Sequence, residues 1–175
     1  MRRELLIGCG SRREREIGIE GRKGWESLTT LDQNNDHEPD VVWNLEELPL
    51  PFEDDTFDEI HAYEVLEHIG KQGDWRGFFD QWAEFYRILK PGGFLAATCP
   101  SYKSMWAWGD PSHTRVLTRG TLVFLDQEQY HKQIGQTPMS DFRFYYGADF
   151  ETVWAFEDDQ KLAFAVRARK PIWTP

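Results

Sequence analysis

Positive charge is missing from a long part of this chain. No lysine or arginine occurs from Gly24 to Gly70, and the formal net charge of the whole sequence is -10. A protein that follows a nucleic-acid backbone needs a broad cationic surface to displace the counterions of the phosphates. We therefore expect no nucleic-acid partner. The cations crowded into residues 2–23 form either a solvated face or a local basic rim that holds an anionic group of a ligand.

Cysteine and long apolar runs are also scarce. Cys9 and Cys99 are the only cysteines, too few for a disulfide framework, and we predict two reduced thiols in the core. No run approaches the roughly 20 apolar residues of a membrane-spanning helix, and the N-terminus has no apolar signal-peptide core. The sequence thus predicts a cytoplasmic protein with no membrane partner. Its 175 residues fit one domain, residues 1–175.

The clearest structural signal lies near the start of the chain. Leu5, Leu6 and Ile7 suit a strand buried on both faces of a parallel sheet, and Gly8 and Gly10 follow it directly. Ligands of open α/β sheets bind outside the carboxyl ends of the strands, so this glycine loop marks the expected site. A Gly-x-Gly turn alone is equally often an ordinary turn that binds no ligand. Further strands are expected at residues 27–31, 41–43, 57–63 and 94–98.

The expected helices are unevenly distributed. Residues 11–23 have scattered charge and little apolar periodicity, which predicts a loop or a stunted helix where a crossover helix would normally stand. Asp74 is expected to cap a core-facing helix that ends before Pro91. The remaining segments predict a long active-site loop at residues 101–116, a helix from Thr118 to about residue 129 and a C-terminal hairpin at residues 150–156 and 161–169.

In their order and spacing these motifs resemble the class I S-adenosylmethionine-dependent methyltransferases, in particular the methyltransferase domain type 11 group. The matching pieces are the glycine loop, Asp32 at the end of the second strand, and the runs at residues 40–46, 48–52, 57–60, 65–69 and 87–93. The resemblance implies an α/β fold, a Rossmann-like three-layer sandwich. Its mostly parallel sheet has the order 3-2-1-4-5-7-6 with strand 7 antiparallel, here with trimmed helices on the strand 1–3 side.

The same resemblance implies S-adenosyl-L-methionine as the cofactor and methyl transfer by in-line displacement to an unidentified acceptor, which we expect to be a small molecule. Asp32 can accept two charge-assisted hydrogen bonds from the ribose diol, although an aspartate at a strand end is also a common turn residue. Asn44 stands where the family often has an acid near the adenine amino group, and a turn asparagine is the alternative. The expected cofactor-binding residues are Gly8, Cys9, Gly10, Ser11, Asp32, Gln33, Asn44, Leu45 and Glu64.

A general base is needed only when the acceptor must lose a proton, because alignment and exclusion of water supply much of the acceleration. The candidates near the strand ends are Glu64, His68 and His113. For His68 the competing interpretation is a structural role at the start of a helix. His113 lies in the loop that is expected to border the acceptor.

The same region contains residue types that could bind a metal ion. His61, Glu64, Glu67 and His68 include the residue types that bind zinc. His61, however, lies inside the expected strand while the others leave it, and the family that the chain resembles uses this run without a metal. We therefore predict no metal site.

Two features of the chain depart from the family and keep alternatives open. Ser11, Arg12 and Arg13 stand where the family often adds a glycine, and the chain starts directly at the first strand. Cover for the site must then come from residues 101–116 or from the partner chain of a homodimer, or the site has no cover. One alternative is a catalytically degenerate binding or regulatory protein. The other is a nicotinamide-dependent oxidoreductase, which lacks here the third glycine that opens a helix for a pyrophosphate.

Overall fold

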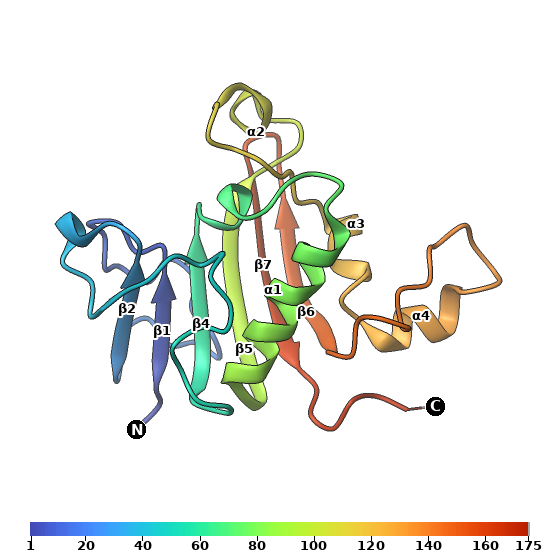
Figure 1. The fold of residues 1–175 in the computed structure, drawn as a ribbon, viewed down its shortest axis with the longest axis horizontal. Helices are drawn as coiled ribbons and strands as arrows, with labels where there is room; N and C mark the ends of the chain where they lie inside the picture. The colour runs from blue at the N-terminus through green and yellow to red at the C-terminus, as the bar shows by residue number, and fades with distance from the viewer. Residues whose placement is uncertain (175) are drawn as a thin grey trace.

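The computed structural model describes residues 1–174, and its strands form one sheet in the order β3-β2-β1-β4-β5-β7-β6 (Figure 1). The first five strands along the chain run parallel to one another, whereas β7 is antiparallel to both β5 and β6. The predicted fold class, strand order and antiparallel strand are confirmed. The strands are β1 (Glu4–Ile7), β2 (Leu28–Asp32), β3 (Val41–Val42), β4 (Phe57–Tyr63), β5 (Leu89–Pro100), β6 (Phe150–Glu157) and β7 (Lys161–Ala168).

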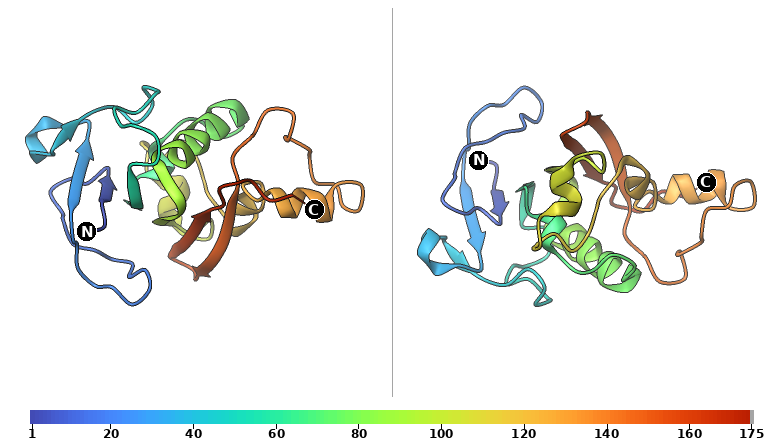
Figure 2. Two further views of the ribbon diagram at one scale, coloured as in Figure 1. Left: turned by 90° about the horizontal axis from the view of Figure 1, so that it is seen from below. Right: turned by 90° about the horizontal axis from the view of Figure 1, so that it is seen from above.

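The connections on the β1–β3 side are trimmed, as predicted. Residues 11–27 join β1 to β2 without a helix, and only the short 3-10 helix η1 (Asn35–His37) precedes β3. Figure 2 shows this long loop on the face of the sheet opposite α1. Ile19 from the loop packs against Ala96 and Ala165 of the sheet, so the loop covers part of the face that a crossover helix would normally cover.

The main core lies between the sheet and α1 (Trp75–Ile88). Asp74 caps this helix as predicted, because its carboxylate accepts from the N–H of Gly77 at 3.1 Å. The buried aromatic side chains of α1 lie on one face of the helix, as its apolar spacing predicts. Trp82 meets Phe150 of β6 edge to face. The chain passes from α1 directly into β5 at Leu89, ahead of the expected residue 94, because Leu89 already pairs with Phe57.

The predicted single helix from Thr118 to about residue 129 is wrong, because two short helices occupy this stretch. Thr118 caps α3 (Arg119–Val123). This helix ends at Phe124, whose N–H donates to the carbonyl of Thr121 at 3.2 Å. Asp126 then caps α4 (Gln127–Gln133) by accepting from the N–H of Glu128 at 2.9 Å. The second cap takes the backbone donors that a continuous helix would have used internally.

A buried network of charges fastens residues 11–27 to the sheet. Glu59 of β4 is fully buried and contacts the guanidinium groups of Arg15 and Arg22, and its Oε2 lies 2.9 Å from Nε2 of His61. The ring of Trp25 lies under the Arg15 guanidinium, 4.6 Å from it. Burial alone would raise the pKa of Glu59, but hydrogen bonds from His61 and Arg22 and the charge of Arg15 lower it to about 2.

This network predicts a specific loss of stability in acid. Because the pKa of Glu59 falls from 4.5 to about 2 on folding, its stabilising contribution is present above pH 4.5 and disappears as the pH approaches 2. We expect Glu59→Gln to lower the free energy of unfolding at pH 7 by about 3 kcal/mol and to flatten its decline between these two pH values. Urea unfolding across this pH range measures both effects.

The control is Glu53→Gln, which changes an exposed glutamate of the β3–β4 connection. This variant should keep both the stability and the pH dependence of the parent protein. An unaltered acid profile in Glu59→Gln would show that the buried carboxylate does not stabilise the fold in this way.

Candidate functional site

Two cavities meet at the carboxyl ends of β1, β2 and β4. The first has a volume of about 390 Å³, and the second, of about 700 Å³, opens beside the glycine loop and the start of residues 11–27. Gly8 and Glu64 line both, so the two cavities adjoin at these residues. The first is otherwise lined by Leu31, Asp32, Gln33, Trp43, Asn44, Leu45, Glu46, Val65, His68 and Ile69. The second is otherwise lined by Leu6, Cys9, Gly10, Ser11, Arg12, Glu14, Glu16 and Tyr63.

The glycine loop needs its glycines for two reasons. Gly8 and Gly10 have positive φ angles of 57° and 50°, a region that other residues rarely adopt. In addition, a Cβ at Gly8 would lie 2.2 Å from Cγ2 of Val65, which directly precedes the 3-10 helix η2 (Leu66–His68). The loop and the chain after β4 therefore approach one another as closely as only glycine allows.

Asp32 is fixed at the end of β2 by backbone donors. Its Oδ2 accepts from the N–H of Gly10 at 2.8 Å, and its Oδ1 accepts from the N–H of Asn34 at 2.9 Å. A carboxylate offers about four acceptor positions, so each oxygen keeps capacity for a further donor on the cavity side. The aspartate acts as a turn residue and also lines the first cavity, and these two interpretations are compatible.

Asn44 likewise combines a turn with a place in the cavity wall. Its Oδ1 accepts from the N–H of Glu46 at 3.0 Å, which is the turn geometry that the sequence offered as an alternative. The neighbouring Leu45 is almost fully buried and presents an apolar surface to the cavity. Gln33 lies in the same wall and is exposed.

The sequence prediction missed several cavity residues. Trp43 and Glu46 flank the predicted pair at residues 44–45, so the same turn motif could have found them. Val65 and Ile69 lie at the two ends of η2, inside the run that carried the resemblance. Their role as cavity wall depends on how closely Gly8 lets η2 approach, which a local sequence pattern does not show.

Cys9 and Ser11 lie on the side of the second cavity. Cys9 is buried, and burial raises the pKa of its thiol, so it is a core group more than a reactive one. The Oγ of Ser11 lies 3.0 Å from Nδ1 of His37 and joins the glycine loop to η1. Both cysteines are free, as predicted.

The two candidate histidines come together, although they are far apart in the sequence. Nδ1 of His68 lies 3.2 Å from the carbonyl of Ser112, and Nδ1 of His113 lies 2.9 Å from the carbonyl of Trp106. A carbonyl only accepts, so in both rings Nδ1 carries a proton and Nε2 is the nitrogen that does not face a carbonyl. The two rings lie 4.7 Å apart and nearly perpendicular. Glu64 stands in the cavity wall beside them, with a positive φ of 54°.

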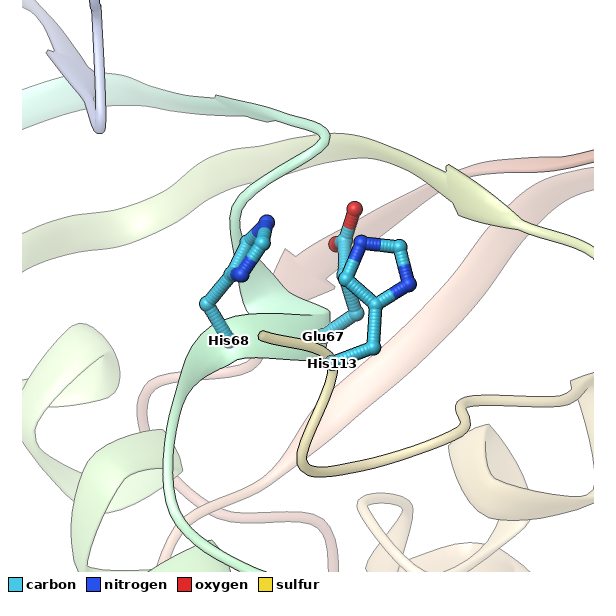
Figure 3. Close-up of side chains that lie close together, drawn as sticks. All are labelled: Glu67, His68 and His113. Carbon is cyan, nitrogen blue, oxygen red and sulfur yellow. The ribbon is translucent and has the colours of Figure 1, made fainter. Parts of the chain in front are cut away.

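Glu67 lies next to this pair in an unusual environment. Its side chain is buried, and neither carboxylate oxygen has a hydrogen-bond partner. Burial, together with the charges of Glu64 and Asp110, raises the pKa of Glu67 to about 8. His61, which the sequence grouped with these acids, lies instead in the buried network of Glu59. Figure 3 shows that the Glu67 carboxylate and the rings of His68 and His113 converge.

Residues 101–116 pack against η2, but none of them, His113 included, lines either of the two cavities. They contain one unpredicted short helix, α2 (Met105–Gly109), which lies beyond the carboxyl ends of the strands in Figure 1. The N–H groups of Thr114 and Arg115 donate to the carbonyl of Glu67 at 2.9 and 3.1 Å, so this loop is fixed against η2. Trp106 and Trp108 remain exposed on α2.

Comparisons with known proteins agree with this geometry. A family model described as a methyltransferase domain matches residues 5–97, more than half of the chain. No curated protein matches the sequence. Among residues 1–174, no helix is long and apolar enough to span a membrane.

Solved structures share the fold at low sequence identity. A SAM-dependent methyltransferase from Archaeoglobus fulgidus is 16% identical with a TM-score of 0.55, and the match covers 95% of this chain and 86% of that one. N-methyltransferase NodS from Bradyrhizobium japonicum WM9, in complex with S-adenosyl-L-homocysteine, is 15% identical with a TM-score of 0.52 and coverages of 95% and 78%. The [4+2]-cyclase SpnF is 15% identical with a TM-score of 0.54 and coverages of 98% and 75%.

The fold, the glycine loop and the family match define a class I S-adenosylmethionine-dependent methyltransferase domain. The chain belongs to this methyltransferase domain family, and its cofactor is S-adenosyl-L-methionine. The family and the cofactor predicted from the sequence are confirmed.

The close approach of Gly8 to Val65 predicts a large difference between two glycine variants. Gly92→Ala, at a φ of 76° with open space around the new Cβ, should lose only about 1 to 2 kcal/mol of unfolding free energy. Gly8→Ala should lose roughly 1 to 3 kcal/mol more, because its Cβ also displaces Val65. Chemical denaturation of both variants makes the comparison, and equal losses would show that η2 accommodates the methyl group.

Proposed function

We propose that the protein transfers the methyl group of S-adenosyl-L-methionine to a small-molecule acceptor, with the donor lying across the two adjoining cavities. The observation that carries this proposal is Asp32. Backbone donors on both sides hold its carboxylate at the end of β2, and the carboxylate lines the first cavity. A fixed carboxylate with spare acceptor capacity suits the two hydroxyl groups of a ribose.

The adenosine half of the donor fits the first cavity. Leu45 offers an apolar surface for the face of the adenine ring, and Gln33 and Asn44 stand at its edge. Because the oxygen of Asn44 already accepts from Glu46, its amide N–H₂ is the freer group and suits a ring nitrogen of the base. In this assignment the ribose lies against the Asp32 carboxylate, on the cavity side of its hydrogen bond to Gly10.

The amino-acid half of the donor fits the second cavity by charge. Arg12 lines this cavity and is exposed, and it is a cation that suits the donor carboxylate. Glu14 and Glu16 lie in the same wall and suit the ammonium group. Glu64, which lines both cavities, lies where the positive charge of the sulfonium would fall.

The acceptor is proposed to enter the first cavity on the side where His68 forms its wall. The bound donor supplies an electrophilic methyl carbon with a neutral thioether as its leaving group. In His68 and His113 the proposed general-base atom is Nε2, because Nδ1 donates to a backbone carbonyl in each ring. Glu64 is the remaining catalytic candidate. We further propose a cytoplasmic enzyme, with a homodimer partner as a source of additional cover for the site.

The role of Asp32 gives a direct test of the proposal. Asp32→Asn keeps the size of the side chain but removes the charge that strengthens hydrogen bonds from the ribose, so S-adenosyl-L-methionine should bind about 10- to 100-fold more weakly. Titration calorimetry with S-adenosyl-L-methionine measures this change. NAD should not bind to the parent protein at comparable concentrations.

The matched control is Asp36→Asn, in the exposed first turn of η1 four residues further along the chain. It should bind the donor as well as the parent protein does. If Asp32→Asn and Asp36→Asn bind the donor equally, the ribose does not lie at the end of β2 and the proposed donor orientation is wrong.

A second candidate function has one specific observation in its favour. The [4+2]-cyclase SpnF shares this fold, so the fold alone does not fix the reaction. The alternative for this chain is a catalytically degenerate protein that keeps the donor site for binding or regulation. Tight donor binding without formation of S-adenosyl-L-homocysteine, across a panel of hydroxyl, amine and thiol acceptors, would favour this alternative.

A further inference from the structure

We propose that Glu67, His68 and His113 form a binding site for a divalent transition-metal ion, with Zn²⁺ as the ion that fits the ligands best. One ligand atom from each of the three residues lies within 4.8 Å of the others. Figure 3 shows the carboxylate and the two imidazole rings pointing toward one another from η2 and from residues 101–116.

The hydrogen bonds of the two histidines prepare them as metal ligands. In each ring Nδ1–H donates to a backbone carbonyl, that of Ser112 for His68 and that of Trp106 for His113. Metal-binding histidines almost always donate their second ring N–H in this way, because it fixes the tautomer and the ring orientation. In both rings Nε2 is thereby the nitrogen left to bind a metal ion.

Glu67 is the second and independent observation. Its side chain is only 3% exposed, and neither carboxylate oxygen meets a hydrogen-bond donor. A buried carboxylate without a partner costs stability, and native proteins seldom leave such a group unexplained. A cation between Glu67 and the two imidazole nitrogens would supply the missing partner.

The backbone holds the three ligands in register. The carbonyl of Glu67 accepts from the N–H groups of Thr114 and Arg115, so the segment that carries His113 is fixed against η2. Ligand atoms on a tetrahedral zinc ion are about 3.4 Å apart, given zinc–nitrogen distances of about 2.0–2.1 Å. Small rotations of the side chains therefore close the present separations. Asp110, whose Oδ2 lies 3.8 Å from Nε2 of His113, adds negative charge beside the site.

The ligand set also indicates the type of ion and its use. Two imidazole nitrogens favour zinc or a similar transition metal over Mg²⁺ and Ca²⁺, which prefer oxygen ligands. Three protein ligands leave at least one coordination position open, as in catalytic zinc sites. His68 also lines the first cavity, so a metal-bound acceptor oxygen or nitrogen would face the donor. This last step alone rests on the proposed function. In the metal-loaded protein the two imidazoles are ligands and not general bases.

The test is metal binding by the full chain in the absence of S-adenosyl-L-methionine. After treatment with a chelator, the protein is titrated with Zn²⁺ by calorimetry and with Co²⁺ by visible absorption, which reports the coordination geometry. We expect one Zn²⁺ per chain, and affinities at least about tenfold lower in Glu67→Gln and in His113→Ala. Two variants are used because the loss of either ligand should have the same effect, and circular dichroism verifies that each is folded.

The matched control is His131→Ala, which removes an exposed histidine of α4 and should leave Zn²⁺ binding unchanged. Absence of Zn²⁺ binding by the parent protein would overturn the metal site, as would binding that both ligand variants retain in full. Donor affinity is measured separately on the same metal-free protein. A failure of donor binding with Zn²⁺ binding intact would therefore count against the proposed function and not against the metal site.

Discussion

The close contact between Gly8 and Val65 is the constraint on which the geometry of the site depends. The glycine loop leaves β1 with positive φ angles and passes so close to the chain after β4 that no Cβ fits between them. This contact places η2 directly beside the loop, and the two cavities adjoin at that position. Asp32 then joins the loop to the end of β2 through the N–H of Gly10. Three strand ends are thereby combined into one surface.

Short sequence patterns predicted the parts of the molecule that depend on residues close together in the chain. The strand order followed from the motifs of a known family, and Phe57–Tyr63 was bounded correctly because its buried strand is flanked by turn residues. Asp32 and Asn44 were found because both end a strand next to a turn. In each case the relevant neighbours are only a few residues away in the sequence, or belong to the family motif itself.

The parts that escaped prediction depend on contacts between distant segments. Glu67 and His113 meet because the N–H groups of Thr114 and Arg115 dock on the carbonyl of Glu67, and no spacing in the sequence encodes those hydrogen bonds. His61 belongs with Glu59 and Tyr63, which alternate along one face of β4, and its network faces away from Glu67. The break between α3 and α4 similarly arises because Asp126 caps α4 within an otherwise helical stretch.

The buried charges beneath residues 11–27 have a consequence for how ligands enter and leave. Lifting this segment would separate Arg15 and Arg22 from Glu59, and it would also separate the Trp25 ring, which belongs to the segment, from the sheet. Residues 11–27 are therefore a fixed part of the site wall, and the demethylated cofactor has to leave without displacing them.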